Sequence, residues 1–267
     1  MKSQSTRERM AKQTVEACER GWYLDRIGRK VSFSRELQAA MQSTMSHPEW
    51  DSETHHKGNH ETRYSVTNET TLQCARRLVD QGEDVVLLNF ASAKHPGGGF
   101  LRGSIAQEES LALCSGLYPC INGDPMYRYH ARNRGGIYSD WAIYSPDVPV
   151  IRDDVTGEYL DLPWVVSMIT CPAVNKTALR GHAATLLEDS MRRRISKVLT
   201  VGSQHDTIIL GAWGCGIFGQ DPAEVSLWFE EALDGKFKGT FEHVAFAVLD
   251  NTPTKQYITP FEERFGE

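Results

Sequence analysis

The stretch that decides the fold is DVVLLNFASAKHPGGGFLRGSIAQEES, residues 84–110. Its first seven residues, Asp84–Phe90, form a short apolar run typical of a strand buried on both faces of a parallel sheet. Three consecutive glycines, Gly97–Gly99, follow. Ser104 and Gln107 then have the spacing of a capping box, which predicts a helix over Ser104–Ser115. The order is therefore strand, glycine-rich loop and helix.

Three more apolar runs predict buried strands, and helical patterns lie between them. We expect these strands at Pro163–Thr170, Thr207–Ala212 and His243–Leu249, and helices near Ala183–Leu199 and at Pro222–Leu233. Strands that alternate with helices indicate an α/β fold with a largely parallel or mixed sheet. The region between the first and second strands, residues 117–162, is rich in Tyr, Pro, Asp and Gly and is expected to contain short strands.

The first third of the chain has helical patterns instead. Apolar residues recur at helical spacing before Gly21, again after Ser34, and from Asn68 to Gln81, whereas residues 48–64 are polar and irregular. The sequence therefore predicts two parts. Residues 1–82 are an N-terminal helical extension, and residues 83–267 are the α/β domain.

Composition limits the class of protein. The chain has 267 residues, 40% of them hydrophobic, and a formal net charge of −6, which argues against nucleic-acid binding by charge alone. No apolar run approaches the roughly 20 residues that cross a bilayer. The N-terminus lacks the hydrophobic segment of a secretory signal. Six cysteines without a CxxC pair are typical of reduced thiols, so we expect a cytoplasmic protein that does not bind membranes.

A second glycine-rich loop, GAWGCGIFGQDP at residues 211–222, also follows a predicted strand and precedes a helix. Glycine lets backbone N–H groups approach phosphate oxygens, and the helix N-terminus adds a favourable dipole. Neither loop has the Walker A pattern or a complete dinucleotide fingerprint. Glycines that only make tight turns are one interpretation. Two such loops at strand ends favour a nucleotide or diphosphate ligand.

Two carboxylates follow the first loop. Glu108 and Glu109 fall in the first turns of the predicted helix, where adjacent residues point about 100° apart. One carboxylate can therefore face a reacting bond while the other holds the substrate. Taken alone, the pair favours the simpler interpretation of acidic residues stabilised by the helix dipole.

Together these motifs resemble a known family. The glycine triplet Gly97–Gly99, followed after a short spacer by Gln107-Glu108-Glu109, resembles the signature of poly(ADP-ribose) glycohydrolases, and the surrounding sequence is similar to their compact bacterial type. The second loop resembles the diphosphate loop of the same proteins. The similarity extends from about Asn89 to about Asp250. His95 and Gln220-Asp221 depart from the family pattern, which has Asn and Asn-Pro there.

The resemblance implies a macrodomain-like fold, a mixed sheet sandwiched between helices. It implies hydrolysis of the ribose–ribose O-glycosidic bond of poly(ADP-ribose) from the chain end, releasing ADP-ribose without a metal or cofactor. Glu109 would be the catalytic acid that protonates the departing ribose hydroxyl, and Glu108 would position neighbouring ribose hydroxyls. The implied substrate-binding residues are Asn89, Gly97, Gly98, Gly99, Gln107, Gly214, Cys215, Gly216, Ile217, Phe218 and Gly219.

Two other functions fit the same loops. A non-catalytic ADP-ribose-binding macrodomain would share the glycines but would have no need of Gln107-Glu108-Glu109. A hydrolase of mono-ADP-ribosyl links on protein, nucleic acid or a metabolite would use both. A phosphoesterase is disfavoured because no set of metal ligands accompanies the loops.

Other reactive residues have simpler interpretations. The histidine-rich stretch HHKGNHE, residues 55–61, lacks metal-ligand spacing and predicts a solvated loop. Cys215 could be a nucleophile, but no partner histidine can be placed, so a small loop residue is favoured. His205-Asp206 lacks the GxSxG context of a triad. Arg192–Arg194 predict a solvated helix face, with guidance of an acidic polymer as the alternative.

Overall fold

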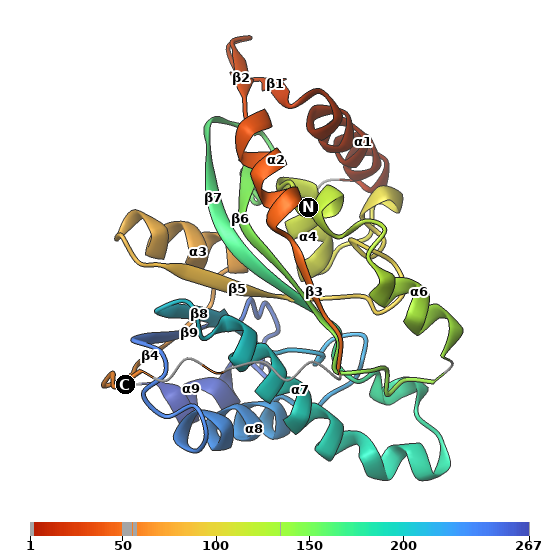
Figure 1. Ribbon diagram of the computed structural model, residues 1–267, viewed down its shortest axis with the longest axis vertical. Coiled ribbons are helices and arrows are strands. Elements are labelled where there is room, and N and C mark those ends of the chain that lie inside the picture. The colour runs from red at the N-terminus through yellow and green to blue at the C-terminus, as the bar shows by residue number, and fades with distance from the viewer. Residues whose placement is uncertain (1–2, 50–54, 56–57, 134, 267) are drawn as a thin grey trace.

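The computed structural model describes residues 3–49, 55, 58–133 and 135–266, and a seven-stranded mixed sheet between helices forms its centre (Figure 1). The strand order is β3–β6–β7–β5–β8–β9–β4. The strands are β3 Met45–His47, β4 Arg63–Thr67, β5 Val85–Phe90, β6 Ala142–Arg152, β7 Tyr159–Cys171, β8 Thr207–Leu210 and β9 His243–Ala247. A separate antiparallel pair consists of β1 Trp22–Leu24 and β2 Lys30–Ser32.

The strands from β7 to β4 run parallel to one another, whereas β6 is antiparallel to β7 and β3 is antiparallel to β6. β5 and β8 are parallel neighbours, with Val85 opposite Thr207 and Leu87 opposite Ile209. Their carboxyl ends therefore lie at one edge of the sheet, and the loops that follow them emerge side by side. The predicted α/β fold with a mixed sheet is confirmed.

Helices cover both faces of the sheet (Figure 1). They are α1 Gln4–Arg20, α2 Ser34–Ser43, α3 Thr71–Asp80, α4 Gln107–Cys114, α5 Leu117–Ile121, α6 Pro125–Arg132, α7 Leu187–Gly202, α8 Pro222–Asp234 and α9 Thr259–Phe265. Short 3₁₀ turns occur at η1 Phe100–Arg102, η2 Lys176–Ala178 and η3 Gly181–Leu186. No helix of the described ranges is both long enough and apolar enough to cross a membrane.

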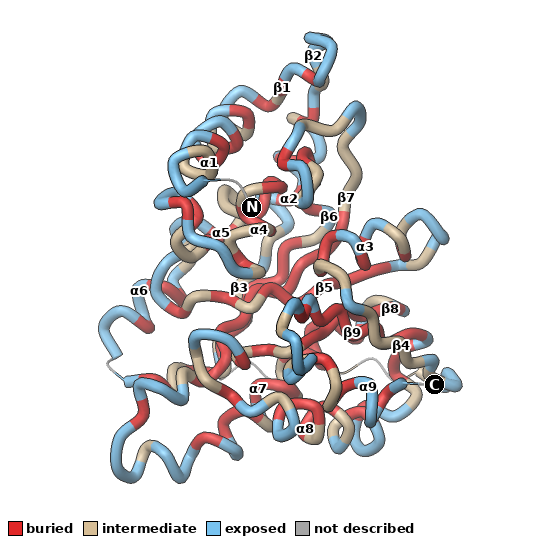
Figure 2. The backbone as a smooth tube through the Cα atoms, turned by 180° about the vertical axis from the view of Figure 1, so that it is seen from behind, coloured by how far each residue is buried: buried red, intermediate tan, exposed pale blue. Residues whose placement is uncertain are grey.

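The central strand β5 is buried on both faces, which explains its continuous apolar run. Val86 and Leu88 join the core cluster that includes α7, α8 and α9. Val85 and Leu87 join the opposite cluster, which includes α3, α4, α5 and α6. Figure 2 shows the buried residues gathered along the central strands and on the helix sides that face them. Burial of both faces fixes the direction in which β5 delivers the loop that follows it.

The first 82 residues are not purely helical, and that prediction is wrong. Both edge strands of the sheet, β3 and β4, come from this part of the chain. Each is short, and no residue of β4 is fully buried, so neither has an apolar run that would reveal a strand. The proposed division at residue 82 therefore separates the edges of one sheet from its centre.

Helix α1 is joined by polar contacts to the loop and helix that follow β5. Arg7 Nε donates to the carbonyl of Gly103 at 2.7 Å, and Gln4 Nε2 donates to the carbonyl of Arg102 at 3.0 Å. Further along the helix, Thr14 Oγ1 donates to the carbonyl of Leu113, in α4, at 2.8 Å. The N-terminal helix therefore packs directly on the loop and helix that carry the glycine triplet and the two glutamates.

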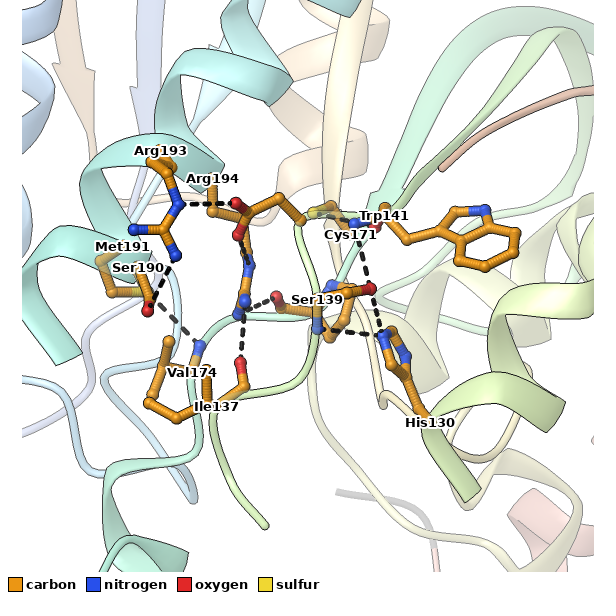
Figure 3. A network of polar contacts seen from close by, with 12 residues as sticks. His130, Ile137, Ser139, Trp141, Cys171, Val174, Ser190, Met191, Arg193 and Arg194 are labelled. Atoms are coloured by element: carbon orange, nitrogen blue, oxygen red, sulfur yellow. Dashed lines mark hydrogen bonds and ion pairs between the residues drawn. The ribbon is translucent and has the colours of Figure 1, made fainter. Parts of the chain in front are cut away.

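The arginine run on α7 is a solvated face only in part, because Arg193 is exposed and Arg192 is partly exposed, and the prediction is wrong for Arg194. Arg194 is fully buried. Its guanidinium donates to the carbonyl of Ile137 at 2.7 Å and to that of Pro172 at 3.0 Å, and it pairs with Asp140 (Figure 3). Arg193 also pairs with Asp140, whereas Arg192 pairs with glutamates at the surface. The apolar stripe of α7 did not reveal that one cation points inward.

We expect Arg194→Met to lower the free energy of unfolding by about 3–5 kcal/mol, because the carbonyls of Pro172 and Ile137 lose their donor and Asp140 loses a buried partner. The matched variant Arg192→Ala removes only half-exposed ion pairs and should cost less than about 1 kcal/mol. Urea unfolding of both variants measures the difference. Equal and small effects would contradict the structural role of Arg194.

Candidate active site

The first glycine loop, residues 91–106, ends where Gln107 attaches α4 to the sheet. Its Oε1 accepts the N–H of Phe90 at 2.9 Å, and its Nε2 donates to the carbonyl of Leu88 at 2.7 Å. The predicted capping box is wrong: α4 begins at Gln107, and no side chain caps it. The amide of Gln107 is held by the backbone of β5, a partner distant in sequence that a local pattern cannot show.

Glu108, the second residue of α4, lies beneath this loop and is 3% exposed. Its Oε2 accepts the N–H of Ser92 at 2.6 Å, whereas its Oε1 is buried without a hydrogen-bond partner in the described part of the chain. Burial raises the pKa of Glu108 to about 8, and the neighbouring Glu109 adds to the rise. At neutral pH Glu108 therefore carries a proton in the free protein.

Glu109 is half-buried, and its Oε1 accepts the N–H of Gly99 at 2.9 Å. Gly98 has φ +60°, a left-handed conformation that favours glycine. A Cβ at Gly98 would overlap Oε1 of Glu109 and would lie 3.0 Å from Oε2 of Glu108. The two carboxylates, predicted to point apart, thus both approach the backbone of Gly98, one from the interior and one from the half-exposed side.

Asn89, the other polar group of this region, lies one residue before the end of β5. Its side chain is fully buried, and Nδ2 donates to Oγ1 of Thr170 on the adjacent strand at 3.2 Å. Its Oδ1, like Oε1 of Glu108, has no hydrogen-bond partner among the described residues. Buried polar atoms are nearly always hydrogen-bonded in folded proteins. Two unpaired oxygens near one strand end therefore indicate a place where a ligand supplies the missing partners.

The second glycine loop, residues 211–221, presents unpaired donors at the end of β8. Within the described ranges, the N–H groups of Gly214, Gly216, Ile217 and Phe218 donate to no other residue. Consecutive free N–H groups of this kind form an anion-binding concavity. The side chain of Ile217 is 83% exposed, so it does not cover these amides by packing inward.

Buried side chains brace this loop from below. Trp213 is fully buried, and its Nε1 donates to the carbonyl of Cys171 at 3.2 Å. Gln220, one of the departures from the family pattern, donates from Nε2 to the carbonyl of Val174 at 2.6 Å, and its N–H bonds the carbonyl of Gly214 at 3.0 Å. Gln220 therefore closes the loop on itself. Asp221 caps α8 by accepting the N–H of Ala223 at 2.9 Å.

The other reactive residues singled out in the sequence do not form a nucleophilic, triad or metal site within the described residues. Cys215 is buried, and burial raises the pKa of its thiol, which opposes a nucleophilic role. His205 binds Asp84 and Tyr144 at the opposite end of the strands from the glycine loops. His56 lies outside the described residues. Among those described, no group of histidine, cysteine or acidic residues has the arrangement of a metal site.

Sequence reasoning missed two residues that lie between the loops. His130 on α6 bonds the carbonyl of Ala93 in the first loop at 3.1 Å. The Tyr138 ring lies 6.3 Å, centroid to centroid, from the Phe218 ring in the second loop. Neither belongs to a glycine motif, and the excursion that carries them has no periodic pattern. Only the three-dimensional arrangement identifies them.

A family profile described as "Microbial-type PARG, catalytic domain" matches residues 11–153. The chain belongs to this family. It is 42% identical to the poly(ADP-ribose) glycohydrolase of Thermomonospora curvata bound to the inhibitor ADP-HPD, with a TM-score of 0.89 over 98% of this chain and all of that one. The Deinococcus radiodurans poly(ADP-ribose) glycohydrolase in complex with ADP-ribose is 38% identical, with a TM-score of 0.79 over 85% of this chain and 96% of that one. Comparison with curated proteins finds no match.

Membership of the microbial-type poly(ADP-ribose) glycohydrolases confirms the resemblance seen in the sequence and the macrodomain-like fold. The profile ends at residue 153, before the second glycine loop. The structural similarity to the Thermomonospora curvata glycohydrolase covers 98% of the chain and so extends beyond the profile. Both parts of the candidate site therefore belong to one fold shared with this family.

We expect Gly98→Ala to lower turnover about a hundredfold, since the added methyl group displaces Glu109 and the site depends on its placement. Gly82→Ala is the matched control. Gly82 also has a positive φ, +85°, but a Cβ there meets no atom within 4 Å. The control should cost about 1 kcal/mol of stability without loss of turnover. Initial rates and thermal melting of both variants separate displacement from backbone strain.

We expect Glu108→Gln to change how stability depends on pH. The folded protein keeps the Glu108 proton up to about pH 8, whereas an ordinary glutamate releases it near 4.5. This group therefore makes folding less favourable as pH rises from 4.5 to 8. Glutamine is neutral throughout. The free energy of unfolding of the variant should therefore rise relative to that of the wild type between pH 4.5 and 8. Denaturation curves of both proteins at pH 4.5 and at pH 8 measure this. The same difference in free energy of unfolding at both pH values would contradict a buried proton on Glu108.

Proposed function

We propose that this glycohydrolase cleaves the ribose–ribose O-glycosidic bond of poly(ADP-ribose) at the chain end, with Glu109 as the general acid. Membership of the family and the similarity to two bacterial poly(ADP-ribose) glycohydrolases support the activity. The observation that carries the assignment of the site is that the two glycine loops meet at one edge of the sheet. The glutamate pair and the free amides of the second loop lie at the carboxyl ends of two adjacent strands, β5 and β8.

Each part of the site matches one part of the ligand. The free N–H groups of Gly214, Gly216, Ile217 and Phe218 suit the diphosphate, because they carry no competing partner. Asn89 Oδ1 and Glu108 Oε1 lack partners of their own, and ribose hydroxyls are able to fill both places. Gly97, Gly98 and Gly99 keep the first loop free of side chains where it passes the carboxylates.

The chemistry assigned to Glu109 follows from its half-buried position. Its carboxyl group donates a proton to the oxygen of the departing ribose, and the bond between that oxygen and the anomeric carbon breaks. The resulting carboxylate then takes a proton from water as the water oxygen bonds the oxocarbenium-like carbon. The raised pKa of Glu108 keeps its proton in place at neutral pH, so Glu109 does not face a second negative charge there.

Further parts of the proposal concern compartment and partners. All six cysteines are free thiols, which supports a reducing cytoplasm. The ligands proposed are poly(ADP-ribose), other ADP-ribosylated molecules and the product ADP-ribose. Cys215 and Gly219 are assigned to the loop that holds the diphosphate, and Gln107 is assigned to the attachment of α4.

We expect Glu109→Gln to lower the release of ADP-ribose from poly(ADP-ribose) by at least about a hundredfold, because the acid and base are lost. Affinity for ADP-ribose should survive. Glu224→Gln is the matched control, since Glu224 occupies the same third position of α8 and is largely exposed. Product chromatography measures the release, and calorimetry measures the binding.

Four results would change the proposal. Full turnover by Glu109→Gln would remove Glu109 from the chemistry. Intact polymer after incubation with the wild type, with ADP-ribose bound tightly, would make the protein a reader. Release from mono-ADP-ribosylated protein or nucleic acid but not from polymer would identify the other hydrolase. Early appearance of oligomers in place of ADP-ribose would contradict cleavage at the chain end.

A further inference from the structure

Tyr138 has a backbone conformation that is unusual for its residue type. Its φ is +58°, in the left-handed region that glycine and asparagine adopt at lower cost than an aromatic residue. Such a residue persists only where the surrounding structure fixes it, and strain of this kind gathers at functional sites. The segment that contains Tyr138, residues 135–141, connects α6 to β6.

The neighbours of Tyr138 are held on both sides. Before it, the carbonyl of Gly136 accepts the N–H of Asn175 at 2.7 Å, and the carbonyl of Ile137 accepts a bond from the buried Arg194 at 2.7 Å. After it, Ser139 binds His130, and Asp140 binds Arg194 (Figure 3). These contacts hold the residues on both sides of Tyr138 in place.

His130 connects this segment to the first glycine loop. Its Nε2 accepts the N–H of Ser139 at 3.2 Å (Figure 3). The proton of the neutral ring is therefore on Nδ1, which donates to the carbonyl of Ala93 at 3.1 Å. Burial lowers the pKa of His130 to about 4, so this arrangement is stable at neutral pH. His130 thus fixes the start of the loop that carries Gly97–Gly99.

The Tyr138 ring lies between His130 and the second glycine loop. Its centroid is 5.5 Å from the His130 ring and 6.3 Å from the Phe218 ring, with interplanar angles of 49° and 45°. Both distances are within the range of favourable aromatic pairs. The chain of contacts runs from Ala93 through His130 and Tyr138 to Phe218. One ring therefore joins the support of the first loop to the tip of the second.

We propose that Tyr138 is a positioning residue that sets the spacing between the two glycine loops through its ring. Because the ring acts through Phe218 and His130, its effect falls on the affinity for a ligand held by both loops at once, such as ADP-ribose. The proposal rests on the proposed function for the identity of that ligand. The left-handed backbone is explained by the need to place an aromatic ring at this point.

Two substitutions separate the ring from the backbone and from the hydroxyl. Tyr138→Asn accepts the left-handed conformation and removes the ring, so the variant should keep a melting temperature close to that of the wild type. We expect its dissociation constant for ADP-ribose to rise about five- to tenfold, the scale of lost aromatic contacts. On poly(ADP-ribose), KM should rise more than kcat falls. Tyr138→Phe keeps the ring and should restore wild-type affinity.

Tyr64→Ala is the control for a lost aromatic pair elsewhere. Tyr64 lies 5.3 Å, centroid to centroid, from Phe265 on the edge strand β4, so this variant should melt earlier while binding ADP-ribose normally. Wild-type affinity in Tyr138→Asn would overturn the proposal. Equal weakening in Tyr138→Phe would also overturn it, because the hydroxyl would then be the active group.

Failure of the proposed function gives a different result. A wild type that releases no ADP-ribose from the polymer would refute the activity. The affinities of the Tyr138 variants for ADP-ribose would still decide the role of the ring.

Discussion

The attachment of Gln107 to β5 is the contact on which the site depends. Its amide bonds the backbone of Phe90 and Leu88 and so fixes the residue at which α4 begins. A start one residue later would rotate every side chain of the helix by about 100°. Glu108 would then leave its buried position, and Glu109 would no longer meet the N–H of Gly99. The glycine triplet allows the loop to pass close to the carboxylates, and Gln107 determines the direction in which the carboxylates point.

The protein has a net charge of −6, so its overall charge does not attract an anionic ligand. Arg192, Arg193 and Arg194 all pair with acidic groups of the protein, so the alternative that this run guides an acidic polymer loses its free cations. The free N–H groups in the second loop remain available to an anionic ligand. The neutral state of Glu108 helps as well, because an unpaired buried carboxylate would repel the diphosphate.

Sequence predicted the features that rest on long apolar runs. β5, β8 and β9, the helix over α8 and the two glycine loops all follow from continuous patterns and lie where expected. β3 and β4 did not, because edge strands bury only part of their surface and need no apolar run. The capping box at Ser104 failed for a different reason: its glutamine is held by a strand distant in sequence.

The same distinction applies to single residues. The spacing of Glu108 and Glu109 from the glycines was visible in the sequence, and their family signature indicated the chemistry. Their environments were not visible, because burial of Glu108 depends on how the first loop folds over α4. Arg194 and Tyr138 gave no signal at all. An inward arginine and a left-handed tyrosine are fixed by contacts between segments that only the folded protein brings together.

The parallel pairing of β4 with β9 has a consequence for biosynthesis. Arg63 lies opposite His243, 180 residues later in the chain. During translation β4 leaves the ribosome early, yet β9, its partner strand in the sheet, emerges only about 180 residues later. Chain entropy opposes such distant pairings until the intervening strands are in place. This edge of the sheet, a short strand that carries Arg63, therefore stays unpaired until β9 has been made.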